Sequence, residues 1–249
     1  MTTPIIFIPK LSAYFIMKQA PHFKWYSDYE KSLSVRNYEY SDFEEFTANE
    51  KAMLSFYIKG YPEVISQLFP LQNISFMKTV AGKDWDFPYT FIVNEHNVIV
   101  LTAKTLQSFA SFGFNNRYVQ ETILHEIIHL HQKRNQGDYD EYYTKVYKFE
   151  KIKCANYASF SEKVITNPDG YVSNNMIWTI IINNERWMPY LEISMKEKMV
   201  KVIDNNIVII EASPEIYRIY SNMFKVQSQR YHPNEIFARI NAKKLIFEL

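Results

Sequence analysis

Residues 122–134 of this chain read TILHEIIHLHQKR and contain the motif H-E-x-x-H, from His125 to His129. Residues four apart lie on the same face of a helix, so a helix here would aim the imidazoles of His125 and His129 at one point. Two imidazole nitrogens in that arrangement suit a Zn²⁺ ion, whose bonds to histidine are about 2.0–2.1 Å long. The stretch therefore predicts a metal site built on one helix.

The residues around the motif favour a helix. The segment from Arg117 to Lys133 contains no Pro or Gly, and Asn115 or Asn116 stands where an N-cap is expected. Its apolar residues recur at roughly helical spacing: Tyr118, Val119, Ile123, Leu124, Ile127, Ile128 and Leu130. Two surface histidines on an ordinary amphipathic helix are the alternative explanation. The presence of a third ligand would favour the metal site over two surface histidines, because catalytic zinc usually has three protein ligands and a water molecule.

The third ligand is expected from the run Tyr231-His232-Pro233-Asn234-Glu235 near the end of the chain. Pro233 suits the first turn of a helix, which places Glu235 inside that turn. The predicted zinc ligands are therefore His125, His129 and Glu235. Glu126 follows the first ligand directly and would lie beside the metal without binding it. It is the predicted general base, which takes a proton from zinc-bound water.

Two further residues near Glu235 are candidates for the site. His232 is expected first as a hydrogen-bond donor to the oxyanion that forms during hydrolysis. As a fourth ligand it would instead close the site and argue against catalysis, and as a third alternative it only caps the helix. Tyr231 is a rival oxyanion donor, with packing in the core as its alternative.

Composition limits the range of partners. The chain has 249 residues, 47% of them apolar, which is enough for one large domain or two small ones. Its net charge of +1, with no basic stripe, predicts no nucleic-acid partner. No apolar run approaches the roughly 18 residues that span a membrane, and the first residues lack the basic region of a signal peptide. We therefore expect no membrane partner.

The single cysteine, Cys154, excludes an intrachain disulfide and fits a reducing compartment, so an intracellular, cytoplasmic location is expected. Abundant Ile, Asn, Lys, Tyr and Phe indicate an A/T-rich genome, such as that of a large DNA virus, a parasite or a low-GC bacterium. In a virus the location would be the host cytoplasm or the virion.

Local patterns predict an α+β order, in which strands precede the motif helix. The N-terminal part, residues 1–72, is expected as a helical extension that follows a short N-terminal strand or arm and packs on a core formed by residues 73–249. Its main helix is expected to start at a capping box, Ser41-Asp42-Phe43-Glu44. The other expected elements are a helix at Glu63–Phe69, strands at Ile74–Thr79, Tyr89–Val93 and Val98–Leu101, a turn at Asn94–Asn97, a helix near Thr105–Phe112, a helix from Asp138 through Phe149, a turn at Asn167–Gly170, a strand at Ile177–Ile182, a hairpin around Asp204-Asn205-Asn206 and helices at Pro214–Phe224 and Pro233–Phe247.

The motif and the later glutamate resemble the zincin superfamily of zinc metallopeptidases, in the gluzincin style. The wider pattern FPYT, VIVLT, HEIIHLHQKR, TNPDG and YHPNEIFAR is similar to an uncharacterised zincin-like group of microbes and large DNA viruses, over roughly Ile74 to Leu245. The resemblance implies a zincin-like core and zinc-dependent hydrolysis of a peptide or protein substrate. It also implies that Asn97–Leu101 is the edge strand that aligns a peptide by β-addition.

The chain departs from the zincin patterns beside the ligands. A metzincin would have Gly at position 132 and His at position 135, where Gln132 and Asn135 stand, and the thermolysin-like pattern has an Asp where Arg239 stands. The carboxylate that usually supports a metal-bound histidine is therefore not assigned by these patterns. Its three candidates are Asp138, Asp140 and Asp169. Two other functions remain as alternatives. One is an inactive zincin-fold binding or structural protein, and the other is a zinc amidohydrolase acting on a non-peptide bond.

Overall fold

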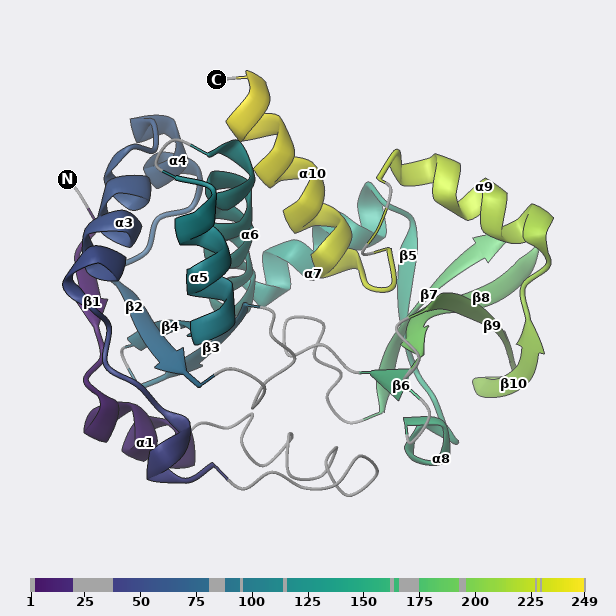
Figure 1. The fold of residues 1–249 in the computed structure, drawn as a ribbon. Helices are drawn as coiled ribbons and strands as arrows, with labels where there is room; N and C mark the ends of the chain where they lie inside the picture. The colour runs from purple at the N-terminus through teal and green to yellow at the C-terminus, as the bar shows by residue number, and fades with distance from the viewer. Residues whose placement is uncertain are drawn as a thin grey trace. The chain divides into compact units, whose positions relative to one another are not determined.

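Two β-sheets, each with helices packed against it, make up the described part of this α+β chain (Figure 1). The computed structural model describes residues 3–19, 38–80, 88–94, 96–113, 116–161, 164–165, 175–192, 196–226, 228 and 230–248. The chain divides into two compact units. Unit 1 comprises Met1–Arg134 and Asn241–Leu249, and unit 2 comprises Asn135–Ile240.

The sheet of unit 1 has the strand order β1-β2-β4-β3. Strands β1 (Ile5–Phe7), β2 (Ile74–Thr79) and β4 (His96–Thr102) run parallel, while β3 (Tyr89–Val93) is antiparallel to β4. The short N-terminal strand expected before the helical part of residues 1–72 is present as β1, which pairs with β2. The strands expected at residues 74–79 and 89–93 are confirmed.

The prediction of an edge strand at residues 97–101 is wrong. These residues belong to β4, which pairs with β2 on one side and β3 on the other. The edge strands among the described residues are β1 and β3. The expected turn is also shorter, because His96 and Asn97 already pair with Val93 and Ile92.

Both faces of this sheet are covered (Figure 1). On one face, helix α1 (Lys10–Gln19) packs its Ala13 and Met17 against strand side chains that include Phe91 and Val98. On the other face lie the helices α3 (Ala48–Lys59), α4 (Glu63–Leu68), α5 (Ala103–Ser111) and α6 (Arg117–Arg134). Helix α6 packs on β3 and β4. The sheet therefore forms the surface on which the helix that carries the motif packs.

Helix α3 begins later than the sequence suggests. Its capping box is formed by Thr47 and Glu50, not by Ser41 and Glu44. The residues around Phe43 instead run extended beside β2, where Phe43 forms a bridge to Thr79 and is fully buried. Burial of a large aromatic side chain here outweighs the local capping signal. The short 3₁₀ turn η1 (Tyr40–Asp42) directly precedes Phe43.

The sheet of unit 2 is antiparallel and has the order β10-β9-β8-β7-β5, with β6 paired to β8. The expected hairpin turn at Asp204-Asn205 is present, and a second turn lies at Asn183-Asn184; the φ angles of these four residues are positive, between 49° and 62°. Such angles are typical of the tight turns that fit the twist of a hairpin. The strands are β5 (Phe149–Lys153), β6 (Val164–Ile165), β7 (Met176–Ile182), β8 (Glu185–Glu192), β9 (Glu197–Ile203) and β10 (Asn206–Glu211).

Helices cover this second sheet as well. One face packs on side chains of α7 (Gln136–Lys145), α9 (Pro214–Phe224) and the start of α10 (Pro233–Glu248). The other face packs on α8 (Tyr157–Ser161) and on Cys154, which is a free, fully buried thiol. The helix expected through Phe149 is wrong at its end, because α7 stops at Lys145 and Phe149 opens β5.

Two further predictions concern a turn and the absence of a membrane-spanning segment. The turn predicted at residues 167–170 lies outside the described residues. Within the part of the chain that the structure describes, no helix combines the length and the apolar character needed to cross a membrane.

Candidate metal centre

Helix α6 is held at its start by a specific cap. The side-chain oxygen of Asn116 accepts hydrogen bonds from the backbone N–H groups of Tyr118 (2.9 Å) and Val119 (3.4 Å). The hydroxyl of Tyr57, on α3, donates to the carbonyl of Gly113 (2.8 Å) and accepts from the N–H of Asn116 (3.3 Å). The expected N-cap at Asn116 is therefore confirmed, and α3 fixes where the motif helix begins.

The first turn of α10 is also anchored. His232 is its N-cap: the backbone carbonyl of His232 accepts from the N–H of Ile236 (3.1 Å), and its ring Nδ1 accepts from the N–H of Asn234 (3.1 Å). Ile236 is fully buried in the core of unit 2. The last turns of this continuous helix belong to unit 1, where the Arg117 guanidinium lies 5.3 Å from the ring centroid of Phe247.

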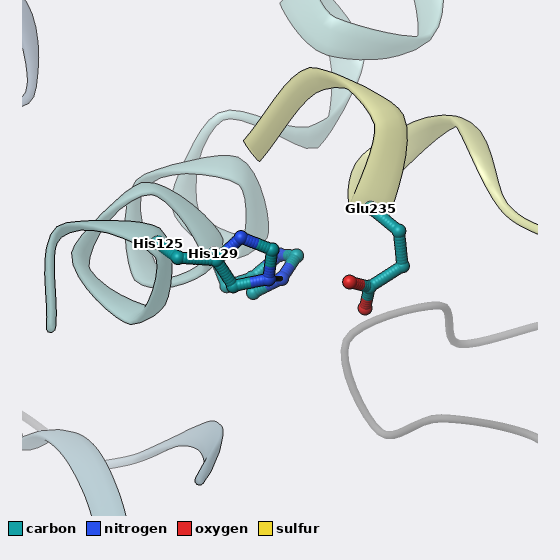
Figure 2. Close-up of side chains that lie close together, drawn as sticks. All are labelled: His125, His129 and Glu235. Carbon is teal, nitrogen blue, oxygen red and sulfur yellow. Dashed lines mark hydrogen bonds between the residues drawn. The ribbon is translucent and has the colours of Figure 1, made fainter. Parts of the chain in front are cut away.

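The three predicted ligands come together (Figure 2). One potential ligand atom from each of His125, His129 and Glu235 lies within 4.8 Å of the others, and all three residues are buried. The Nε2 atoms of the two histidines are 2.8 Å apart, with the rings nearly perpendicular at 85°. The Glu235 carboxylate points toward these rings and is fully buried.

This arrangement fits a zinc ion. A tetrahedral ion with bonds of about 2.0–2.1 Å to nitrogen separates two nitrogen ligands by about 3.3 Å, close to the 2.8 Å between the two Nε2 atoms. Two imidazoles and one carboxylate are also a typical donor set for catalytic zinc. A divalent cation would in addition supply the positive charge that favours burial of a carboxylate.

A residue that the sequence reasoning missed supports one of the ligands. The Nδ1 atom of His129 lies 2.6 Å from the Oε1 atom of Gln132, and Gln132 is only 2% exposed. The signal was present in the sequence, since a residue three positions after His129 lies one turn further along the same face. In the sequence, Gln132 stands out only as a departure from the metzincin pattern.

The acidic candidates for this supporting role are placed elsewhere. Asp140 forms an ion pair with Lys151 at 2.7 Å, and Asp138 lies in the first turn of α7. Asp169 lies outside the described residues. The contact expected from a carboxylate is therefore made by the Gln132 amide.

The other predicted site residues are located as follows. Glu126 is 4% exposed and adjoins His125 on α6, outside the set of three ligand residues. His232 is 7% exposed and caps α10, while Tyr231 is partly buried just before it. His131 packs edge-on against Phe69, with ring centroids 5.6 Å apart.

The cap constrains the chemistry of His232. A backbone N–H can only donate, so the Nδ1 atom that receives it carries no proton. In the neutral ring the proton therefore resides on Nε2, which makes that atom a donor. A protonated nitrogen cannot bind a metal, so this cap disfavours His232 as a fourth ligand.

No protein-family model, no curated protein and no solved structure matches the chain. The function must therefore be argued from the geometry of the chain's own residues.

Proposed function

We propose that this protein is a zinc-dependent peptidase of zincin-like architecture. The observation that carries the proposal is the convergence of His125, His129 and Glu235 within 4.8 Å. These residues derive from two segments more than 100 positions apart in the chain, and each is buried. A chance pair of surface histidines would not be expected to meet a buried glutamate in this way.

The surrounding residues have roles in peptide hydrolysis. Zinc, when bound, would polarise the scissile carbonyl and make a water molecule a better nucleophile. Glu126 would accept a proton from that water at its carboxylate and pass it to the departing amine. His232 would donate from Nε2 to the oxygen on which negative charge develops. Tyr231 is a second candidate donor for the same oxygen.

Strand β3 is the better candidate for aligning a peptide. It is an edge strand of the described sheet, it runs antiparallel to β4, and it packs on α6. A peptide that adds to β3 would use backbone hydrogen bonds for affinity, which requires no particular side-chain sequence. The proposed substrate is therefore an extended peptide or an unfolded segment of a protein.

The first test is the metal content of the purified protein, measured by elemental analysis. We expect about one zinc ion per chain, and loss of that ion in His129→Ala and in Glu235→Ala. His131→Ala is the matched control, because His131 lies on the same helix and packs against Phe69. An absence of zinc in the wild type, even after supplementation, would reject the metal site.

The second test separates zinc binding from catalysis. Glu126→Gln removes the base but leaves the three ligands, so zinc should be retained while peptide turnover falls by at least about 100-fold. Turnover would be measured with a library of fluorogenic peptides. Full activity in Glu126→Gln would contradict the mechanism. Zinc in the wild type without any turnover would instead favour a zincin-fold binding protein.

A further inference from the structure

The contact between Gln132 and His129 has a consequence for which atom of His129 binds a metal. Their atoms Oε1 and Nδ1 lie 2.6 Å apart, and the two residues are 2% and 1% exposed. An amide oxygen can only accept a hydrogen bond, so the proton of the neutral His129 ring resides on Nδ1. Its Nε2 atom then carries the lone pair, and that atom lies 2.8 Å from Nε2 of His125.

We propose that Gln132 is the positioning residue of this centre: it holds His129 in the tautomer and orientation that present Nε2 to the metal. This inference rests on the proposed zinc site. It assigns to a neutral amide on the motif helix itself a role that in many zinc sites belongs to a carboxylate or a backbone carbonyl.

The choice of an amide changes the charge of the site. A carboxylate partner would raise the basicity of the histidine and add a negative charge beside the metal, and both effects strengthen metal binding. Gln132 orients the ring without adding that charge. With two neutral imidazoles and the Glu235 carboxylate as ligands, a bound Zn²⁺ ion and its three ligands would carry a net positive charge, which the Glu126 carboxylate beside them would offset. The amide therefore orients the ring without adding a third carboxylate to those of Glu126 and Glu235.

The inference is tested by three variants whose zinc dissociation constants are measured by competition with a chromophoric chelator. Gln132→Met keeps the length of the side chain and removes the acceptor, so zinc affinity should fall by about 10- to 100-fold. Gln132→Glu restores an acceptor and adds a charge, so affinity should equal or exceed that of the wild type. Gln120→Met, the same change at a partly exposed position of α6, should leave affinity unchanged.

A measurement on the metal-free protein makes the test independent of zinc. Long-range ¹H–¹⁵N correlation spectra distinguish the two histidine tautomers. His129 should show a proton on Nδ1 in the wild type, and a mixture of both tautomers in Gln132→Met. Thermal unfolding of the same metal-free samples identifies a variant that has merely lost its fold.

Three results would overturn the inference. One is a Gln132→Met affinity within about twofold of the wild type. Another is a Gln132→Glu variant as weak as Gln132→Met while both stay folded, since the acceptor would then be irrelevant. The third is a proton on Nε2 of His129 in the wild type. If the wild type binds no zinc but shows the expected tautomer, the proposed function fails while the role of Gln132 in orienting His129 stands.

Discussion

Lys78 shows at the scale of one residue how a buried charge is accommodated in this chain. It lies on β2 and is only 5% exposed, and its Nζ atom is 3.0 Å from carboxylate oxygens of both Glu44 and Glu50. The other oxygen of Glu50 accepts from the N–H of Thr47 (2.8 Å) at the start of α3. Glu50 therefore joins the cap of α3 to the sheet of unit 1.

The pKa of Lys78 reflects this pairing. Burial alone would lower the pKa, but the hydrogen bonds and charges of Glu44 and Glu50 outweigh burial and raise it above the ordinary value of 10.5. A cation whose pKa is raised on folding stabilises the protein fully below its unfolded pKa. That contribution is lost as the pH rises through the folded value.

We therefore predict that Lys78→Met lowers the free energy of unfolding by about 2 kcal/mol at pH 8, because it leaves Glu50 without its buried cation. The difference from the wild type should shrink above about pH 10.5, where Lys78 of the unfolded chain begins to lose its charge while the folded protein, with its raised pKa, still holds the proton. Urea unfolding between pH 8 and pH 11 measures both effects. Lys243→Met, at an exposed position, is the control, and a difference that stays constant with pH would contradict the pairing.

At the same scale, the sequence identified the three proposed ligand residues but not the residue that contacts one of them. His125, His129 and Glu235 follow from helical spacing and from donor chemistry, both of which are local properties. The role of Gln132 depends on the side-chain conformation that brings its amide to Nδ1 of His129. Spacing permits that contact but does not require it, so a comparison with family patterns that expect a carboxylate overlooked it.

At the scale of the element, the motif helix α6 depends on its first turn. Asn116 provides the cap, and Tyr57 of α3 bonds to both Asn116 and Gly113. The cap was predictable, because Asn just before a long apolar-periodic segment is a strong N-terminal signal. The contribution of Tyr57 was not, because it comes from a residue 59 positions away.

We predict that Asn116→Ala lowers the free energy of unfolding by about 1 kcal/mol, the usual effect of losing a helix cap. Asn116→Asp should retain most of the stability, since a carboxylate oxygen accepts the same two N–H groups. Chemical denaturation of the metal-free protein gives both values. Equal losses in Ala and Asp variants would show that the cap contributes little.

The order of the strands within the sheet could not be predicted from the sequence. The segments of β2, β3 and β4 were located by their apolar, β-branched residues, yet β4 proved to be internal and β3 an edge. Pairing partners are set by long-range contacts that no local pattern encodes. Strand β5 was missed for a different reason: Lys148, a residue type seldom found at positive φ, adopts φ 62° and turns the chain directly from α7 into the strand.

At the scale of the whole molecule, the chain forms two units, and α10 contributes residues to both. A metal that binds only the folded state stabilises it by mass action, by about 2.7 kcal/mol when the free ion is at 100 times its dissociation constant. The proposed ligand residues are also too far apart in the sequence for the unfolded chain to form the same site. Zinc binding should therefore be measurable as thermal stability.

We predict that saturating zinc raises the unfolding temperature by roughly 5–10 °C relative to the chelator-treated protein. Differential scanning calorimetry would measure the shift. His129→Ala should show no shift, whereas His131→Ala should retain it. An unfolding temperature of the wild type that does not change on addition of zinc would argue against a specific site.

The burial of Cys154 makes the natural protein a suitable background for site-specific labelling. A buried structural thiol is inert toward thiol-reactive dyes, so the native fold should label poorly. Cysteines introduced at Gln107 of α5 and Glu215 of α9, both exposed, would then be the reactive pair, one in each unit. Energy transfer or spin–spin distances between the two labels would report the separation of the units in solution, with and without zinc.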